Sequence, residues 1–228
     1  MIGAETTAIV DAVGQRAGSV QIKAGASLEI ETGWLKVQDD SSSNRNGTLT
    51  IGDESGGEQA RLSLRGGELF TKKLERTENG HFEFTGGSLH ADVVMFDLVV
   101  DGGTLAPGKR IGTTSVHGDV LLNDGSTLEI NLDGNSSDLL VVDGRLDLGT
   151  ETQLDIVQLS DDVLGSRYLI ATYQGDLDGS FQTITNGFSI DASTPGELYL
   201  LVPEPTTGVF LLATVWALFA RAQVRRKS

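Results

Sequence analysis

The feature that most constrains the fold is a short motif that returns about every 20 residues along the chain. It reads apolar, any, apolar, any, Gly, Gly, any, Leu, and the steps between successive marker leucines are 21, 20, 20, 16 and 23 residues. A repeat of this length is typical of architectures in which one small unit stacks on the next. The marker leucines are Leu28, Leu49, Leu69, Leu89, Leu105 and Leu128.

The alternation inside the motif predicts short strands with one buried and one solvated face. A unit of this length with two or three strands is one coil of a β-solenoid, because a single coil cannot bury its apolar row whereas a stack of coils can. We therefore predict an all-β chain with a solenoid over residues 1–157. The alternative is an antiparallel sandwich with glycine turns, since short strands separated by frequent turns fit that architecture too.

Three glycine pairs mark the corners of the predicted coils. A glycine there allows a positive φ or a close approach of two backbones, which a residue with a Cβ atom resists. We predict a structural role in turns for Gly66, Gly67, Gly86, Gly87, Gly102 and Gly103.

Residues 158–202 differ in character from the repeats before them. They hold all three tyrosines of the chain and four runs typical of short strands. We predict that this segment is a short β cap over the open end of the solenoid, because an uncovered edge invites aggregation.

Charge and cysteine content exclude several classes of function. The chain has 17 basic and 32 acidic residues, a net charge of −15, so nucleic acid phosphates would repel it, and we predict no nucleic-acid partner. The chain has no cysteine, which excludes disulfides, zinc knuckles and thiol catalysis.

Catalytic motifs and metal-ligand spacings are missing from the sequence. His81, His90 and His117 are isolated, and there is no phosphate-binding loop, dinucleotide fingerprint or nucleophile elbow. We therefore predict no catalytic residue, no metal, no cofactor and no enzymatic activity. The alternative is a β-helix lyase or hydrolase acting on a polysaccharide, which needs a cluster of carboxylates on one face. Its candidate residues are Asp92, Asp97, Asp101, Lys109 and Arg110.

Two loops and two threonine pairs suggest further ligands. Calcium prefers six to eight oxygen ligands, and neither loop matches a known calcium motif, so we expect solvated turns. The loop residues are Asp133, Asn135 and Asp138, and Asp39, Asp40 and Asn44. An ice-binding solenoid needs regular ranks of threonine, whereas this chain offers only Thr48/Thr50 and Thr183/Thr185 as close pairs.

The last 26 residues (203–228) have three parts in a fixed order. Pro203, Glu204 and Pro205 come first and end the preceding strand. A segment without charge follows over 206–220, and a basic tip follows over 221–228. A helix over 206–220 would be roughly 22 Å long, against a hydrocarbon core of about 30 Å, so we predict a short transmembrane helix suited to a transient anchor. A buried C-terminal helix is the alternative.

This order of parts resembles the PEP-CTERM sorting signal of exported bacterial proteins. The resemblance rests on Pro203, Glu204 and Pro205, on the apolar span, and on the basic tip from Arg221. It implies a transient anchor in the inner membrane and processing by an exosortase, a membrane protease. The expected destination is the cell surface or the extracellular matrix, with extracellular polysaccharide as a possible partner.

Residues 102–157 resemble the passenger-associated repeat of autotransporter β-helices. The signature is the run 102–108, Gly-Gly-Thr-Leu-Ala-Pro-Gly, with later strands over 125–130 and 138–142. The resemblance implies a right-handed parallel β-helix that acts as a surface spacer. The outer-membrane barrel of that family does not follow in this sequence, and the sorting tail takes its place.

The first 20 residues do not form a signal peptide. They lack a basic start and an apolar core, and they contain Glu5 and Asp11. We expect the true start of the protein to lie upstream of Met1. A cytosolic remnant that is never exported is the alternative.

Overall fold

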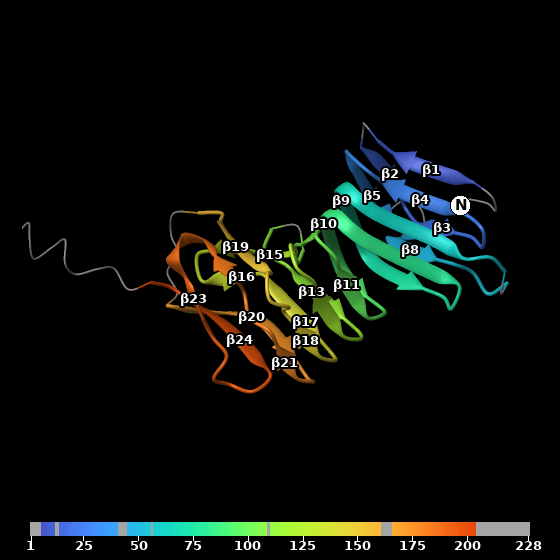
Figure 1. Cartoon of the computed structure of the whole chain (residues 1–228). Coiled ribbons are helices and arrows are strands. Elements are labelled where there is room, and N and C mark those ends of the chain that lie inside the picture. The colour runs from blue at the N-terminus through green and yellow to red at the C-terminus, as the bar shows by residue number, and fades with distance from the viewer. Residues whose placement is uncertain are drawn as a thin grey trace, which may run out of the picture.

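The computed structural model describes residues 6–11, 14–40, 45–55, 57–108, 110–160 and 166–203. These ranges contain strands, turns and one short 3₁₀ turn (Thr185–Gly187), and no α-helix. The all-β prediction is confirmed for this part of the chain. Figure 1 shows the strands following one another along the molecule, from the N-terminal coils to β24.

Most strands stack in three columns by parallel pairing. The chain runs through the first, second and third columns in turn and then starts the next coil. The long strands β9 (Ala60–Arg76) and β10 (Gly80–Val94) each pass through all three columns. The antiparallel sandwich is therefore wrong for the body of the molecule.

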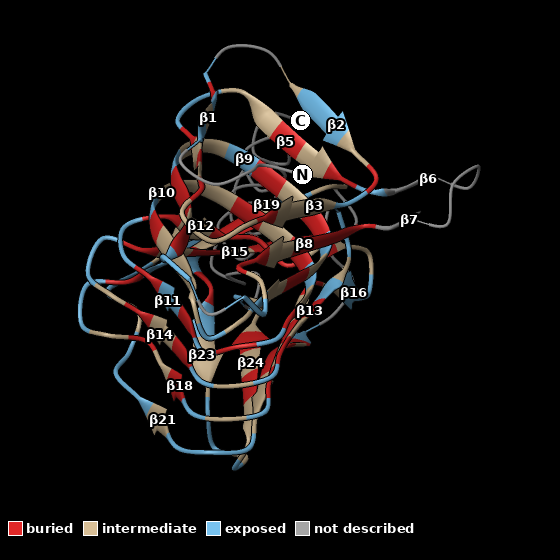
Figure 2. Cartoon of the chain, turned by 90° about the vertical axis from the view of Figure 1, so that its right-hand side faces the viewer, coloured by how far each residue is buried: buried red, intermediate tan, exposed pale blue. Residues whose placement is uncertain are grey.

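The first column is split between two sheets. The two parts of the column are linked by a 2.8 Å hydrogen bond from Asp101 N to Phe84 O, which joins the end of β11 to β10. Figure 2 views the stack from its N-terminal side, with β11, β14, β18 and β21 along one side. The column contains β1 (Thr7–Val10), β4 (Ser27–Ile30), the starts of β9 and β10, β11 (Leu98–Val100), β14 (Val120–Leu122), β18 (Leu146–Asp147) and β21 (Leu177–Asp178).

The second and third columns belong to one large sheet. The second contains β2 (Gln15–Ala17), β5 (Trp34–Val37), the middles of β9 and β10, β12 (Thr104–Leu105), β15 (Thr127–Asp133), β19 (Gln153–Gln158) and β22 (Thr183–Ile184). The third contains β3 (Val20–Ile22), β8 (Thr48–Ile51), the ends of β9 and β10, β13 (Thr113–Val116), β17 (Leu139–Val142) and β20 (Arg167–Tyr173). Short antiparallel ladders interrupt two coils, β6 (Asp39–Asp40) with β7 (Arg45–Asn46) and β15 with β16 (Ser136–Ser137).

A row of leucines from the second column forms the centre of the core. All are buried, and each pairs in register with the next. The predicted repeat is thus correct from Leu69 onward, but Leu28 pairs with Leu62 in the first column and Leu49 with Leu74 in the third. The row consists of Leu35, Leu69, Leu89, Leu105, Leu128 and Leu154.

The glycine pairs lie between the first and second columns and stack on one another. Gly67 and Gly87 have φ values of 64° and 71°. A Cβ atom on Gly87 would lie 2.5 Å from the carbonyl oxygen of Gly67, so the two coils approach too closely for a side chain there. Backbone atoms of the preceding coil also crowd Gly66 and Gly86, the Phe84 ring crowds Gly103, and Gly102 has φ 101°.

The C-terminal end of the stack is closed by antiparallel strands. Parallel stacking continues beyond residue 157, because β20 pairs with β17 and β22 with β19. Only β23 (Ser189–Asp191) and β24 (Glu197–Leu201) reverse the direction, with β24 antiparallel to β20. The β24 side chains Leu198 and Leu200 are fully buried, so this hairpin covers the last coil.

The predicted sorting tail lies almost entirely outside the described residues. Pro203 is described and exposed, whereas Glu204, Pro205, the span 206–220 and Arg221 are not among the described residues. Within the described part of the chain, no helix is long and apolar enough to cross a membrane.

Candidate functional site

An acidic groove lies where the third column turns toward the next coil, over the first three coils. It consists of two adjoining hollows of about 650 and 430 Å³, and both are lined by Asp53, Glu54 and Thr77. The larger hollow is also lined by Ser19, Val20, Gln21, Thr48, Thr50 and Glu75, and the smaller one by Glu78 and Asn79. We call these residues together the acidic groove.

Parallel pairing positions the wall of the groove. Gln21 of β3 pairs with Thr50 of β8, and Thr50 pairs with Glu75 of β9, so one residue from each coil stands in the same outward row. Successive rungs lie about 4.8 Å apart, and this spacing lets Thr50 Oγ1 donate a 2.9 Å hydrogen bond to Glu75 Oε1.

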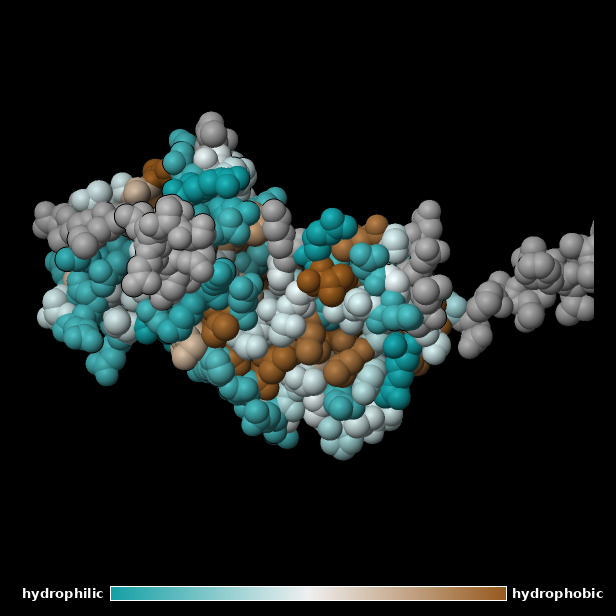
Figure 3. All heavy atoms as spheres, turned by 180° about the vertical axis from the view of Figure 1, so that it is seen from behind, coloured by the Kyte–Doolittle hydropathy of each residue, from teal (hydrophilic) through white to brown (hydrophobic). Residues whose placement is uncertain are grey.

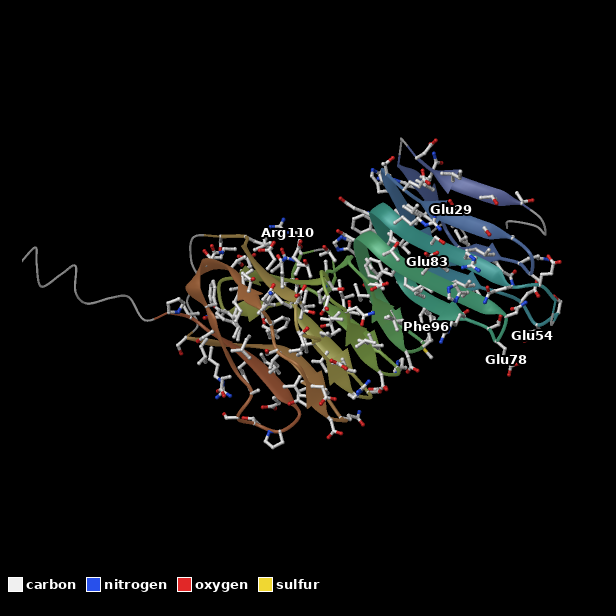
Figure 4. The ribbon with its side chains drawn as sticks, viewed as in Figure 1. Glu29, Glu54, Glu78, Glu83, Phe96 and Arg110 are labelled. Carbon is white, nitrogen blue, oxygen red and sulfur yellow. The ribbon has the colours of Figure 1, made fainter. Side chains whose placement is uncertain are left out.

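The other carboxylates come from the turns that follow β8 and β9. Figure 4 shows Glu54 and Glu78 at the same edge of the N-terminal coils. Both side chains are exposed. The turns are tied together by Asn79, whose Oδ1 accepts hydrogen bonds from Asp53 N at 3.2 Å and from Thr77 Oγ1 at 2.6 Å.

Hydrogen bonding keeps two of the groove carboxylates ionised. Hydrogen bonds from the Ser55 hydroxyl and backbone N–H, and from Ala24 N, hold the pKa of Asp53 below its usual value. Burial raises the pKa of Glu75, but the Lys73 ammonium at 2.5 Å and Thr50 outweigh burial and leave that pKa lowered. The groove is therefore negatively charged at neutral pH.

One hydroxyl in the groove wall is buried without a hydrogen-bond partner. Thr48 is 8% exposed and lines the larger hollow, and its Oγ1 atom makes no hydrogen bond with any residue that the structure describes. A buried polar atom without a partner costs free energy, so such atoms are rare and point to a ligand or an ordered water. This observation is independent of the charge of the groove.

The arrangement suits an organic cation with hydroxyl groups better than a metal ion. Among the described residues, no group of three or more His, Asp or Glu side chains converges closely enough to hold a metal ion. The wall instead combines carboxylates with hydroxyl and amide side chains, which can bind ammonium and hydroxyl groups spread over a larger ligand.

A second carboxylate cluster, on the first column, is satisfied internally. Arg65 lies 3.4 Å from Glu83 and 4.0 Å from Glu29, and the buried Ser63 hydroxyl donates to Glu83 at 3.0 Å. The hydrogen bond from Ser63 and the Arg65 charge lower the pKa of Glu83. Figure 4 shows Glu29 and Glu83 on neighbouring parts of the stack. A general acid needs a raised pKa, so this cluster does not fit that role.

The four candidate residues of the enzyme hypothesis that the structure describes do not form one cluster. Asp97 and Asp101 flank β11, and both accept hydrogen bonds from the next coil. Asp97 Oδ1 accepts one from Asp119 N at 2.9 Å, and Asp101 Oδ1 accepts one from Asn123 Nδ2 at 3.3 Å. Asp92 lines a separate small hollow with Lys72 and His90, beyond β10's second column. Arg110 is exposed in the β12–β13 loop, and Lys109 lies outside the described residues.

The two loops considered as calcium sites differ in how their carboxylates are placed. Asp138 is buried and accepts hydrogen bonds of 2.8 Å from Gly112 N and from both the backbone and side-chain nitrogens of Asn131. Its carboxylate is thus used by hydrogen bonds within the core, whereas Asp133 ends β15 and Asn135 lies in the turn between β15 and β16. For Asp39 and Asp40 only the backbone pairing with β7 is described, and Asn44 lies outside the described residues.

The histidines and threonines make separate local contacts. His90 stacks on Phe70 with ring centroids 4.4 Å apart, His117 Nδ1 lies 2.6 Å from Asp143 Oδ2, and His81 is partly exposed on β10. Thr48 pairs with Lys73, and Thr183 with Gln153. The threonine rank that an ice-binding face needs therefore does not continue from coil to coil.

Comparison with known proteins adds no assignment to this geometry. No protein-family model matches the chain, and no curated protein matches it in sequence.

Proposed function

We propose that this protein is an exported surface or extracellular-matrix protein with a structural and binding role. Its body would be a right-handed parallel β-helix, and its tail a PEP-CTERM signal processed by an exosortase. The observation that carries the proposal is the position of the motif: β24 ends at Leu201 as the closing strand, and Pro203 follows two residues later. A sorting signal must be accessible to its protease, and the exposure of Pro203, which follows the last strand of the described residues, supports the proposal.

The body supports a role as a spacer that presents a binding surface. Its coils are joined by backbone ladders and by buried hydroxyls, such as Ser126 Oγ, which donates to Val100 O at 2.8 Å and accepts from Gly102 N at 3.0 Å. Satisfied polar groups of this kind stabilise a rigid stack. The acidic groove is the surface feature that could select a partner.

A substitution in the sorting motif tests this function. Glu204→Ala in the native host should abolish the processed form at the surface and in the medium, and the full-length chain should accumulate in the membrane fraction. Glu151→Ala, the same change at an exposed turn position of the stack, is the matched control and should be processed as the parent chain is. Unchanged processing of the Glu204→Ala protein would contradict the proposal.

A polysaccharide-active enzyme remains the second candidate, because the acidic groove contains several carboxylates in an open hollow. The lowered pKa values of Asp53 and Glu75 suit ionised groups and not a general acid. Release of reducing ends or unsaturated sugars from matrix polysaccharide by the purified chain would favour this alternative.

A further inference from the structure

We infer that the acidic groove binds amino-sugar units of a cationic glycan, through its carboxylates and its hydroxyl and amide side chains. The inference deepens the proposed binding role by naming the partner's chemistry. It concerns the purified chain, so its test does not depend on how the protein is sorted.

The carboxylates provide sites for the ammonium groups of such a glycan. Glu54 and Glu78 are exposed at the groove edge, where their carboxylates are accessible to a ligand. Asp53 stays ionised beside them because Ser55 and Ala24 donate to it. Hydrogen bonds between an ammonium and a carboxylate are stronger than neutral ones, so this edge favours a protonated amine over a neutral acetamide.

The remaining lining suits sugar hydroxyls. Ser19, Thr48, Thr50 and Thr77 contribute hydroxyls, and Gln21 and Asn79 contribute amides. Thr48 Oγ1 has no hydrogen-bond partner among the described residues, so a ligand hydroxyl that reached it would satisfy a buried polar atom. Val20 is the one apolar side chain of the lining, which argues against the apolar anchors that a protein or peptide partner would bring.

The length of the groove favours a chain of sugars over a single small cation. The two hollows share three residues, and together they extend across three coils. Each hollow is within the size range of small-molecule sites, about 300–1,000 Å³. A linear glycan can therefore place successive units along the same groove.

Figure 3 shows that hydrophilic side chains cover much of the N-terminal half of one face, whereas hydrophobic side chains gather over its C-terminal half. The groove lies in the N-terminal coils. A polar, cationic glycan would thus contact the hydrophilic half of the molecule.

Calorimetry on the full-length chain, purified in mild detergent, tests the inference. The probe is a β-1,4-linked glucosamine hexamer at low ionic strength, and its N-acetylated counterpart is the neutral control. We expect measurable binding of the glucosamine hexamer that weakens with added salt, and affinity for the acetylated hexamer lower by about tenfold or more.

Charge removal at the groove edge should weaken that binding. The double variant Glu54→Gln/Glu78→Gln should lower the affinity by about tenfold. The double variant Glu31→Gln/Glu68→Gln changes the net charge equally at exposed positions outside the groove, and it should bind as the parent chain does. Equal losses in both double variants would show a general charge effect and overturn the inference.

Thr48→Val separates recognition from folding. It removes the unpartnered hydroxyl at nearly constant volume, so Tm should stay the same or rise, while affinity for the glucosamine hexamer should fall by about fivefold. An unchanged affinity would contradict a ligand contact at Thr48. Absence of binding by the glucosamine hexamer, or equally tight binding of a lysine hexamer of matched charge, would overturn the assignment to an amino-sugar glycan.

Discussion

The coil corners contain glycines with positive φ whose surroundings differ sharply. Gly87 has φ 71° and packs against the Gly66–Gly67 backbone, whereas Gly125 has φ 81° and a Cβ atom added there would point into open space. Backbone conformation alone therefore favours glycine at Gly125. At Gly87, both the backbone conformation and the close approach of the preceding coil favour glycine.

Alanine substitutions at these two positions should separate the cost of the backbone conformation from the cost of the close approach. Gly125→Ala should lower the free energy of unfolding by about 1–2 kcal/mol, the cost of the left-handed conformation. Gly87→Ala adds a clash with the Gly67 carbonyl, so we expect a loss of more than about 3 kcal/mol. Urea unfolding measures both. Equal losses would contradict the close approach of the two coils.

Asp138 is the most deeply buried acid of the described residues with a perturbed pKa. Burial raises its pKa from 3.8 to about 6, despite the three N–H groups of Asn131 and Gly112 that favour the ionised form. Since the folded state then holds a proton more tightly than the unfolded state does, its contribution to stability is complete below about pH 4. That contribution is lost as the pH rises through about 6.

Asp138→Asn should remove this pH dependence. The free energy of unfolding of the parent chain should fall, relative to the variant, by at most about 3 kcal/mol between pH 4 and pH 7. Urea titrations of both proteins across this range give the difference in the free energy of unfolding directly. The contributions of the other carboxylates cancel, because both proteins contain them. A constant difference at every pH would show that Asp138 does not titrate in this window.

At the scale of elements, prediction from sequence succeeds where the coils are uninterrupted. Leu69, Leu89 and Leu105 belong to coils without insertions before the second column, and their spacing gives the true register. The β6–β7 hairpin and the long turn after β8 lengthen the second coil. The 21-residue step from Leu28 to Leu49 therefore joins different columns, and a consensus motif cannot reveal this.

The acidic groove could not be predicted because its wall comes from residues far apart in sequence. Gln21, Thr50 and Glu75 stand together only because β3, β8 and β9 pair in parallel. The one available signal is that the third-column strands β8 and β9 are followed by polar and acidic residues, such as Asp53 and Glu78. Without the register of the irregular second coil, this signal does not show which of the residues lie side by side.

The closing hairpin should be a local unit of stability. Leu200 of β24 is fully buried, and Leu200→Ala should cost about 2–5 kcal/mol in this region. In a stack, each coil contacts mainly its neighbours, so hydrogen exchange should quicken in β20, β23 and β24 and stay slow in β9 and β10. Uniform acceleration across the chain would contradict local stabilisation by the cap.

At the scale of the whole molecule, an acidic stack and a tail of separate character follow one another along the chain. The stack closes with β24, and the motif Pro203–Glu204–Pro205 follows at once. We propose that this tail is a sorting signal, and this claim decides whether the protein is exported. The described residues of the body instead supply the binding surface of the acidic groove.

Mapping both ends of the native protein by mass spectrometry tests that claim most directly. The protein would be recovered from the membrane, surface and medium fractions of the native host. We expect a C-terminus near residues 203–207 in the surface or medium form, with peptides from upstream of Met1. An intact Ser228 on a cytosolic protein that starts at Met1 would contradict export and sorting.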